Sequence, residues 1–229
     1  MPEFDEYKDI YHNEINDAIS FSGKPQDYFT KVKAEYLLEL ITRKVKREQA
    51  LKVLDLGCGH GDVHDHLTDS GVSMELTGLD VAASVLEHAK KAHPGNNYIT
   101  YEGNRIPFDD DTFDVAFTIC VMHHVDPAQW ASFLGEMRRV VRPSGIVVVF
   151  EHNPMNPVTR RIVNNCPLDE NAVLLKSSNL TNLVQKTGLN QIETKFIIFT
   201  PFESRFFKGF DRAIGWLPLG AQYYVCGQK

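Results

Sequence analysis

The 229-residue sequence lacks several features that mark particular classes of protein. Its four cysteines stand singly, which excludes the paired spacing of a zinc ribbon or a thioredoxin-type redox site. No uninterrupted apolar run is long enough to cross a bilayer, and the acidic N-terminus, Met1 to Glu6, is unlike a basic signal peptide. We therefore expect a cytoplasmic protein with reduced thiols and no membrane span.

Positive charge is also in short supply. The 24 lysines and arginines are outnumbered by 30 acidic residues, so the formal net charge is −6. A chain of this charge has no global positive field to hold a phosphate backbone, and nucleic acid is not expected as a partner. Local basic patches remain in five arginines: Arg138, Arg139, Arg142, Arg160 and Arg161.

Apolar runs of strand length alternate with amphipathic segments of helix length, the pattern of βαβ units around a mainly parallel sheet. Helices are predicted over residues 27–47, 63–70 and 176–187. The last two strand candidates have no clear helical crossover between them, so we expect them to pair antiparallel. The strand candidates are Lys52–Asp55, Glu75–Asp80, Tyr98–Glu102, Phe113–Ile119, Gly145–Glu151, Ile192–Phe199 and Tyr223–Cys226.

Two kinds of segment depart from this alternation. Residues 151–171 contain three prolines and form an unusually long connection, so we predict a loop that contacts a ligand. Aromatic residues gather near both ends of the chain, and they either wall an apolar pocket or belong to the ordinary core. They are Tyr7, Tyr11, Tyr28, Phe29, Phe202, Phe206, Phe207 and Phe210.

A glycine-rich loop, Gly57 to Gly61, directly follows the apolar strand Val53–Leu56. Glycines there allow a sharp turn and let a ligand approach bare backbone at the carboxyl end of a strand. A dinucleotide fingerprint requires a further glycine at position 62, where this chain has Asp62, a carboxylate that would repel a pyrophosphate. S-adenosylmethionine has no phosphate, and its cationic amine and sulfonium suit Asp55 and Asp62.

Two further polar residues follow strand candidates in chain order. Asp80 ends the second strand candidate, where a carboxylate can accept hydrogen bonds from both ribose hydroxyls. Asn104 follows the third, and its amide could pair with an adenine edge flanked by Val81 or Ile106. Loop, carboxylate and amide in this order indicate the cofactor much more strongly than a glycine loop alone.

These residues resemble the class I S-adenosylmethionine-dependent methyltransferase superfamily, and within it the small-molecule, type 11-like group. The first motif of the family is matched throughout Val53–Gly61, and the similarity covers about residues 50–150. Two departures are Asn104, where the family more often has Asp, and Ser144, where it usually has Gly. The other matching segments are Leu79-Asp80, Pro107-Phe108-Asp109, Phe113-Asp114-Val115, Val121-Met122-His123-His124-Val125 and Arg139–Gly145.

The resemblance implies a Rossmann-like three-layer α/β sandwich with a mostly parallel seven-stranded sheet and an antiparallel last strand. It also implies S-adenosylmethionine as methyl donor and S-adenosylhomocysteine as product. We predict one domain over residues 1–229, with a helical cap (1–50), a cofactor-binding core (51–151), and a substrate loop and C-terminal strands (152–229). The residues expected to bind the cofactor are Asp55, Gly57, Cys58, Gly59, Gly61, Asp80, Val81, Asn104, Arg105, Ile106 and Cys120.

Methyl transfer from a sulfonium is an in-line displacement, in which a base can remove the proton of the acceptor. His123 and His124 follow the fourth strand candidate at the expected cofactor edge, and Glu151 and His152 follow the fifth. Because an imidazole titrates near neutral pH, His123, His124 and His152 are the candidate catalytic residues. The alternative is that each only caps a turn or opens a polar loop.

We expect no metal and no covalent nucleophile. Asn153–Pro157 resembles the Asn-Pro-Pro-aromatic motif of amino-group methyltransferases, but it lacks the aromatic residue and follows the wrong strand. Cys166 has no neighbouring base that would activate its thiol. A group around the glycine loop has partial metal-site spacing, yet one member belongs to the loop and the others should face solvent. It comprises His60, Asp62, His64, Asp65 and His66.

The leading hypothesis is methyl transfer to an oxygen or nitrogen of a small molecule, such as a sugar, a lipid-linked compound or a secondary metabolite. The alternatives are methylation of RNA or protein through the arginines, and a non-catalytic module that only binds S-adenosylmethionine. The sequence indicates neither the acceptor nor the oligomeric state.

Overall fold

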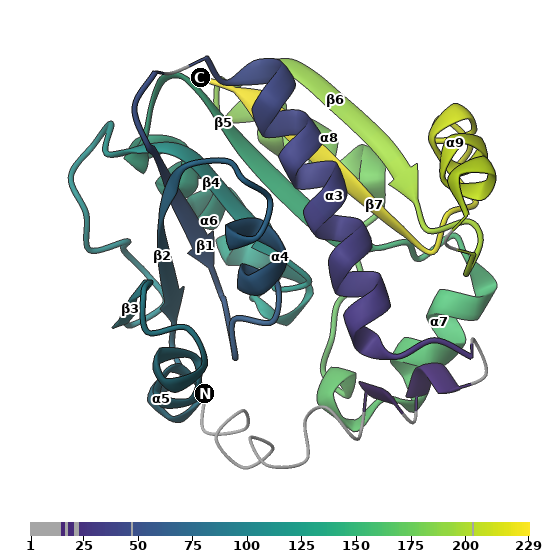
Figure 1. Ribbon diagram of the computed structural model, residues 1–229. Coiled ribbons are helices and arrows are strands. Elements are labelled where there is room, and N and C mark those ends of the chain that lie inside the picture. The colour runs from purple at the N-terminus through teal and green to yellow at the C-terminus, as the bar shows by residue number, and fades with distance from the viewer. Residues whose placement is uncertain (1–14, 17, 21–22, 47, 203) are drawn as a thin grey trace.

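The computed structural model describes residues 15–16, 18–20, 23–46, 48–202 and 204–229. A seven-stranded sheet lies at its centre, in the order β3-β2-β1-β4-β5-β7-β6 (Figure 1). All neighbouring strands are parallel except at β7, which runs antiparallel to both β5 and β6. The strands are β1 (Leu51–Leu56), β2 (Met74–Asp80), β3 (Asn97–Thr100), β4 (Phe113–Ile119), β5 (Val141–His152), β6 (Asn190–Ile197) and β7 (Gln222–Gln228). The predicted sheet with its antiparallel last strand is confirmed.

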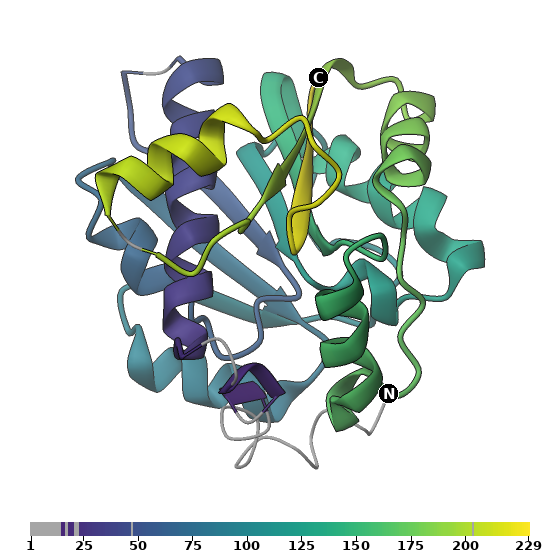
Figure 2. The ribbon, with the colours of Figure 1, turned by 90° about the vertical axis from the view of Figure 1, so that its right-hand side faces the viewer.

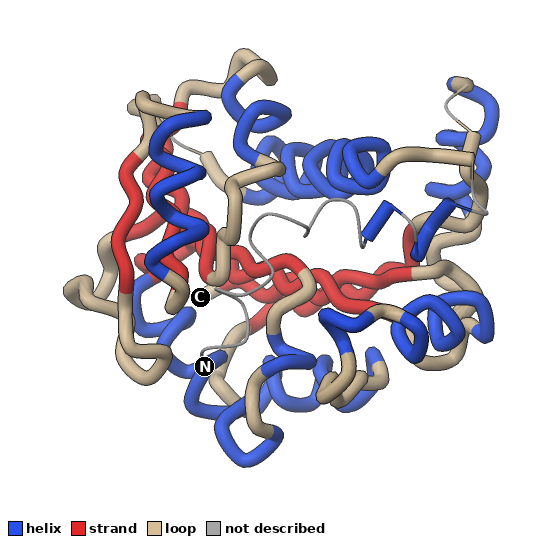
Figure 3. The backbone as a smooth tube through the Cα atoms, turned by 90° about the horizontal axis from the view of Figure 1, so that it is seen from below, coloured by secondary structure: helices blue, strands red, loops and turns tan. Residues whose placement is uncertain are grey.

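Helices cover both faces of this sheet, which Figure 3 shows between two helical layers. On one face α3 and α4 pack against the central strands, and on the other face α6 and α8 do so. The helices are α3 (Gln26–Lys44), α4 (His64–Thr68), α5 (Ala83–Ala92), α6 (Trp130–Val140), α7 (Pro157–Asn165), α8 (Ser177–Lys186) and α9 (Arg205–Ala213). The structure is therefore the expected three-layer α/β sandwich.

Strand periodicity assigns the core residues to these two layers. In β5, Ile146, Val148 and Phe150 pack beneath α3, whereas Val147 and Val149 face α6 and α8. Successive side chains of a strand point to opposite faces, so a strand covered on both sides is apolar at every position. Each fully buried aliphatic or aromatic side chain contributes about 1.5–3 kcal/mol to stability.

The strand order places a topological switch point between β1 and β4. From β1 the chain adds β2 and β3 on one side, and then returns to place β4 and β5 on the other. Ligands of open α/β sheets bind beyond the carboxyl ends of the strands at such a point, because no crossover covers it. Two residues directly follow the strands of the switch point, Gly57 after β1 and Cys120 after β4. Beside them, Asp80 ends β2 and Asn153 follows β5.

Two segments differ from their predicted structure. Residues 151–171, predicted as a loop, contain α7 and a 3-10 turn η4 (Pro167–Asp169). The connection between β6 and β7 does contain a helix, α9, which crosses the outer side of α3 (Figure 2) and is tied to it by ion pairs of Lys208 with Glu35 and Arg212 with Glu39. None of its residues is buried, so α9 lacks a core-facing apolar stripe. The strands it joins are nevertheless antiparallel, as predicted.

An irregularity inside β5, where its register against β4 shifts, explains why a glycine is usual at position 144. Ser144 has φ 68°, a left-handed conformation that costs a non-glycine residue about 1–2 kcal/mol. Gly145 has another constraint: a Cβ there would lie 2.5 Å from the backbone oxygen of Asp114. Position 144 therefore requires an unusual φ, and position 145 requires the absence of a side chain.

Substitutions at these two adjacent positions of β5 should have opposite effects on stability. Ser144→Gly should raise the free energy of unfolding by about 1 kcal/mol because it relieves the left-handed strain. Gly145→Ala should lower it by about 1–3 kcal/mol because the added methyl group meets backbone. Denaturant unfolding measures both, with Gly95→Ala as control because nothing lies within 4 Å of its Cβ position. If Gly145→Ala and Gly95→Ala lower the free energy of unfolding equally, the contact with Asp114 is not the cause.

Candidate active site

The glycine loop after β1 presents bare backbone to an open space. The amides of Gly57 and Cys58 donate to the carbonyl oxygen of Leu79 at 2.7 and 3.0 Å, which fixes the loop against β2. A Cβ on Gly57 would lie 2.5 Å from Val121, whereas a Cβ on Gly59 would meet nothing within 4 Å. Gly57 thus lies in close contact with the protein, and Gly59 lines a cavity of about 860 Å³.

This cavity lies over the switch point. Its floor is made by the residues that follow β1, β2, β4 and β5. Further sides come from Ile15, Ala18 and Ile19, from α3 and α7, and from the segment after β6. Ligand pockets commonly measure about 300–1,000 Å³, so the volume is large enough for more than a single small ligand. The strand order β2-β1-β4-β5 fixes the sequence of functional groups along the cavity.

At the β2 end, Asp80 is aimed into the cavity and held by backbone. Its Oδ2 accepts from the amide of Gly59 at 2.9 Å, and its Oδ1 accepts from the amide of Ala82 at 3.0 Å. Burial raises the pKa of this carboxyl, and these backbone donors only partly oppose the rise. Each oxygen keeps lone pairs for a further donor, so the carboxylate fits a ligand with two adjacent hydroxyls.

Asp55, at the next strand, belongs to a buried network. The carboxylate is 2% exposed and lies 3.0 Å from Nε2 of His64, whose Nδ1 lies 2.7 Å from the hydroxyl of Tyr98. Burial raises the pKa of Asp55 even though His64 opposes the rise. Asp62 accepts from Nε2 of Gln26 at 3.1 Å and also lines the cavity. This end of the cavity therefore favours a cationic ligand over an anionic one.

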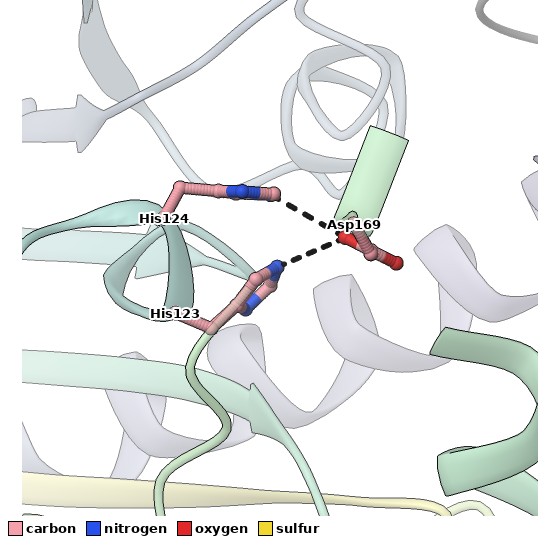
Figure 4. Close-up of side chains that lie close together, drawn as sticks. All are labelled: His123, His124 and Asp169. Atoms are coloured by element: carbon pink, nitrogen blue, oxygen red, sulfur yellow. Dashed lines mark ion pairs between the residues drawn. The ribbon is translucent and has the colours of Figure 1, made fainter. Parts of the chain in front are cut away.

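At the β4 and β5 end, three imidazoles and two carboxylates come together. Nδ1 of His123 lies 2.7 Å from Glu151 Oε2, and its Nε2 lies 3.4 Å from Asp169 Oδ1. Nε2 of His124 faces the same Asp169 oxygen at 3.5 Å, as Figure 4 shows. The ring of His152 is 5.2 Å from that of His123, centroid to centroid. All except Glu151 line the cavity.

The three imidazoles have different charge states. Burial opposes the charged form of His123, but the Glu151 and Asp169 carboxylates outweigh it and hold the pKa of His123 well above its ordinary value. Burial, followed by the positive charge of His123, lowers the pKa of His124 to about 4 and that of His152 to about 4. His123 is thus an imidazolium between two carboxylates, while His124 and His152 are neutral near pH 7.

Comparison with known proteins agrees with this geometry. Residues 54–149 match a family model described as a methyltransferase domain. An uncharacterized methyltransferase of Synechocystis sp. is 35% identical over 106 residues, which are 46% of this chain and 49% of that protein. A SAM-dependent methyltransferase of Thermotoga maritima, known from its crystal structure, aligns over 100% of both chains with a TM-score of 0.69 and 17% identity. Residues 54–149 are therefore similar to a methyltransferase domain, and the chain has the fold of known S-adenosylmethionine-dependent methyltransferases.

The similarity to curated methyltransferases is confined to part of each chain. The phthiotriol/phenolphthiotriol dimycocerosates methyltransferase of Mycobacterium tuberculosis is 32% identical over 109 residues, which are 47% of this chain and 40% of that protein. The chain thus spans about half the length, or less, of these two relatives. S-adenosylmethionine, the cofactor expected from the sequence, is the cofactor of the superfamily.

The predicted cofactor residues of this chain fall into two groups in the structure. Those that line the cavity are Asp55, Gly57, Cys58, Gly59, Asp80, Val81 and Cys120. Gly61, Asn104, Arg105 and Ile106 do not line it, and Gly103 lies there instead. Oδ1 of Asn104 accepts from the amide of Arg105 at 2.6 Å, and Ile106 is buried in the core beneath α6. Cys120 has φ 55°, the kind of strained conformation that gathers at functional sites.

Two residues of the site were not identified from the sequence. Asp169 comes from η4, inside the segment predicted as a loop, and had no motif around it. Lys33 lies on the buried face of α3, is 9% exposed and lines the cavity. The sequence did contain a signal for Lys33. Phe29 and Leu37 lie four residues away on either side, so the lysine interrupts an apolar helix face.

The structure gives other roles to the asparagines of residues 153–157 and to Cys166, which were considered as functional groups from the sequence. Asn156 caps α7 by accepting from the amides of Val158 and Thr159 at 2.9 and 3.0 Å, and Asn153 donates to the carbonyl of Gly220 at 2.8 Å. Burial raises the pKa of Cys166 to about 11, which keeps its thiol protonated. Tyr7 and Tyr11 lie outside the described residues. No helix within the described ranges has the length and apolarity needed to cross a membrane.

The Asp55–His64 pair provides a test of how the glycine-loop end is held. His64→Ala should lower the free energy of unfolding by about 3 kcal/mol, because it leaves a buried carboxylate without its partner. His66→Ala is the matched control: His66 pairs with Asp27 at 2.7 Å, but the aspartate side chain is 71% exposed. That loss should stay below about 1 kcal/mol. Denaturant unfolding measures both changes. Similar losses in the free energy of unfolding would show that the buried pair contributes no more to stability than the exposed one.

Proposed function

We propose that this methyltransferase transfers the methyl group of S-adenosylmethionine to an oxygen or nitrogen of a small molecule. One observation carries the proposal: a single cavity joins bare glycine-loop backbone and Asp80 to the imidazoles of His124 and His152. The first set of groups suits a nucleoside with a cationic side chain, and the second suits an acceptor that must lose a proton. Strand order places the two sets side by side along one sheet edge.

The residues present fit the cofactor. Asp80 would accept hydrogen bonds from the ribose hydroxyls, and Val81 would lie beside the adenine. The amine would lie near Asp55 and Asp62, whose end of the cavity favours a cation. Lys33 supplies a buried positive charge for the carboxylate of the methionyl group.

His152 is the group we propose to take the proton of the acceptor. The acceptor atom forms a bond to the methyl carbon, and the carbon–sulfur bond breaks with its electron pair going to sulfur. The proton of the acceptor passes to the imidazole, so that S-adenosylhomocysteine, the methylated product and an imidazolium result. His123 and His124 both face Asp169, whereas His152 lies beside Gln222, with 3.3 Å between Gln222 Nε2 and His152 Nδ1.

Two observations favour a small-molecule acceptor over RNA. Arg139 is used inside the fold, where it donates to Glu136 and to the carbonyl oxygen of Phe108, both at 2.8 Å. Arg142 pairs with the buried carboxylate of Asp114 at 3.0 Å. The cavity is also walled by apolar side chains, including Phe29, Ile162 and Phe199. A lipid-linked acceptor is consistent with the dimycocerosate named as substrate of the mycobacterial relative.

Asp80 should determine cofactor affinity. We expect micromolar binding of S-adenosylmethionine, and Asp80→Ala should weaken it about 100-fold because two hydrogen bonds to a charged group are lost. Isothermal titration calorimetry measures both values, with His66→Ala as a control that should bind like the unmodified protein. Binding of NADH in place of S-adenosylmethionine would overturn the proposed function.

Transfer can be detected before the acceptor is known. Incubation with labelled S-adenosylmethionine and a metabolite and lipid extract should label one product class, which mass spectrometry identifies. With that acceptor, His152→Ala should lower kcat about 100-fold while the Kd for S-adenosylmethionine changes less than about threefold. His66→Ala should leave kcat unchanged. An unaltered kcat in His152→Ala would exclude it as the base.

A further inference from the structure

His123, His124 and Asp169 lie close enough to share a metal ion, which would take the place of the proton on Nε2 of His123. Both Nε2 atoms face Oδ1 of Asp169, at 3.4 and 3.5 Å (Figure 4). These distances exceed the usual range of about 2.7–3.2 Å for N–H···O hydrogen bonds. Ligands held at about 2.0–2.1 Å from a tetrahedral zinc ion are separated by about 3.3 Å. The three groups offer ligand atoms that all lie within 4.8 Å of one another.

We propose that His123, His124 and Asp169 bind a divalent transition-metal ion of the Zn²⁺ type at the acceptor end of the cavity. Two imidazoles and one carboxylate form a set that prefers Zn²⁺, Fe²⁺ or Co²⁺ over Mg²⁺ and Ca²⁺, which take oxygen ligands. The sequence led us to expect no metal, because only the histidines around the glycine loop had metal-like spacing. Among them, His64 is instead held by Asp55 and Tyr98 in the core.

The surroundings of His123 support this assignment. Its Nδ1 lies 2.7 Å from Glu151 Oε2, which leaves Nε2 directed at Asp169. Metal-binding histidines commonly donate their second ring N–H to a carboxylate, which fixes the ring and strengthens the ligand. Glu151 is fully buried and also accepts from the amide of His152 at 3.3 Å, so its position is fixed as well.

Asp169 is held in place by backbone bonds, although it lies far along the chain from the histidines. The amide of Val173 donates to the carbonyl oxygen of His123 at 2.8 Å, and the amide of Ala172 donates to that of Asp169 at 2.9 Å. The segment after η4 is therefore paired with the 3-10 turn η2 (Met122–His124). This pairing sets the carboxylate above both rings without requiring the metal.

The proposed metal would keep open coordination positions toward the cavity. The side chains of His124 and Asp169 are 19% and 13% exposed, against 1% for His123, and all three line the cavity. Three protein ligands with an open position are the pattern of catalytic rather than structural zinc sites. An acceptor hydroxyl could occupy that position, where the ion would acidify it before His152 takes its proton. This role rests on the proposed function and selects an oxygen acceptor, whereas metal binding itself does not depend on it.

The test is titration of the chelator-treated full chain with Co²⁺, followed by visible absorption, and with Zn²⁺, followed by calorimetry. We expect one equivalent to bind. Asp169→Asn and His124→Gln should each weaken binding at least about 100-fold, and Glu151→Gln about 10- to 100-fold. His66→Gln removes a histidine that also faces an aspartate and should bind the metal like the unmodified protein. Circular dichroism checks that each variant remains folded.

The possible results separate this proposal from the proposed function. If the chain binds S-adenosylmethionine but binds neither Co²⁺ nor Zn²⁺, the metal site is overturned and methyl transfer still stands. One bound Co²⁺ without S-adenosylmethionine binding would support the metal site and overturn methyl transfer. Equal metal affinity in Asp169→Asn and the unmodified chain would also overturn the site, as would an equal loss in His66→Gln.

Discussion

The site depends on the order of the strands around β1 and β4. These neighbours are parallel, but the strands that follow each of them are added on opposite sides of the sheet. Because no crossover passes over their carboxyl ends, backbone and side chains there face open space instead of a helix. Gly57 and Cys58 are held against β2 by the carbonyl oxygen of Leu79, and Cys120 takes its left-handed conformation directly after β4. The cavity follows from sheet topology before any side chain is considered.

The two ends of the cavity differ in how their buried carboxylates are balanced. At the glycine loop, burial raises the pKa of Asp55 and Asp80, so nearby groups compensate their charge incompletely. At the other end, His123 outweighs burial and the pKa of Glu151 and Asp169 is lowered. A cationic cofactor would complete the balance at the first end, since an opposite charge favours the ionised carboxylate. The second end contains its own compensating charge, and the imidazoles of His124 and His152 are neutral there.

Local sequence patterns predicted much of this arrangement. The alternation of apolar residues predicted seven strands, and the glycine loop, Asp80 and the His123–His124 pair each lie at a strand end where chain order placed them. Asn104 was interpreted as an adenine ligand from its position alone. Its side chain instead accepts from the amide of Arg105, because a short amide readily bonds to nearby backbone. Helix α9 was missed although Phe206, Phe207 and Phe210 recur at helical spacing, because these aromatic residues were interpreted as a pocket wall or core, whereas no residue of α9 is buried.

The sequence by itself determined the sheet, the glycine loop and the cofactor class, because each rests on spacing within one short stretch of chain. Asp62 chiefly distinguished the loop from a dinucleotide site, since it occupies a position where a glycine is required. Only the tertiary structure decided which groups line the β4 and β5 end of the cavity. Asp169 meets the two histidines through pairing of Val173 with His123, and Lys33 enters the cavity from α3. Contacts between segments so distant in the chain have no periodicity, because they arise only when the helices and loops pack on the finished sheet.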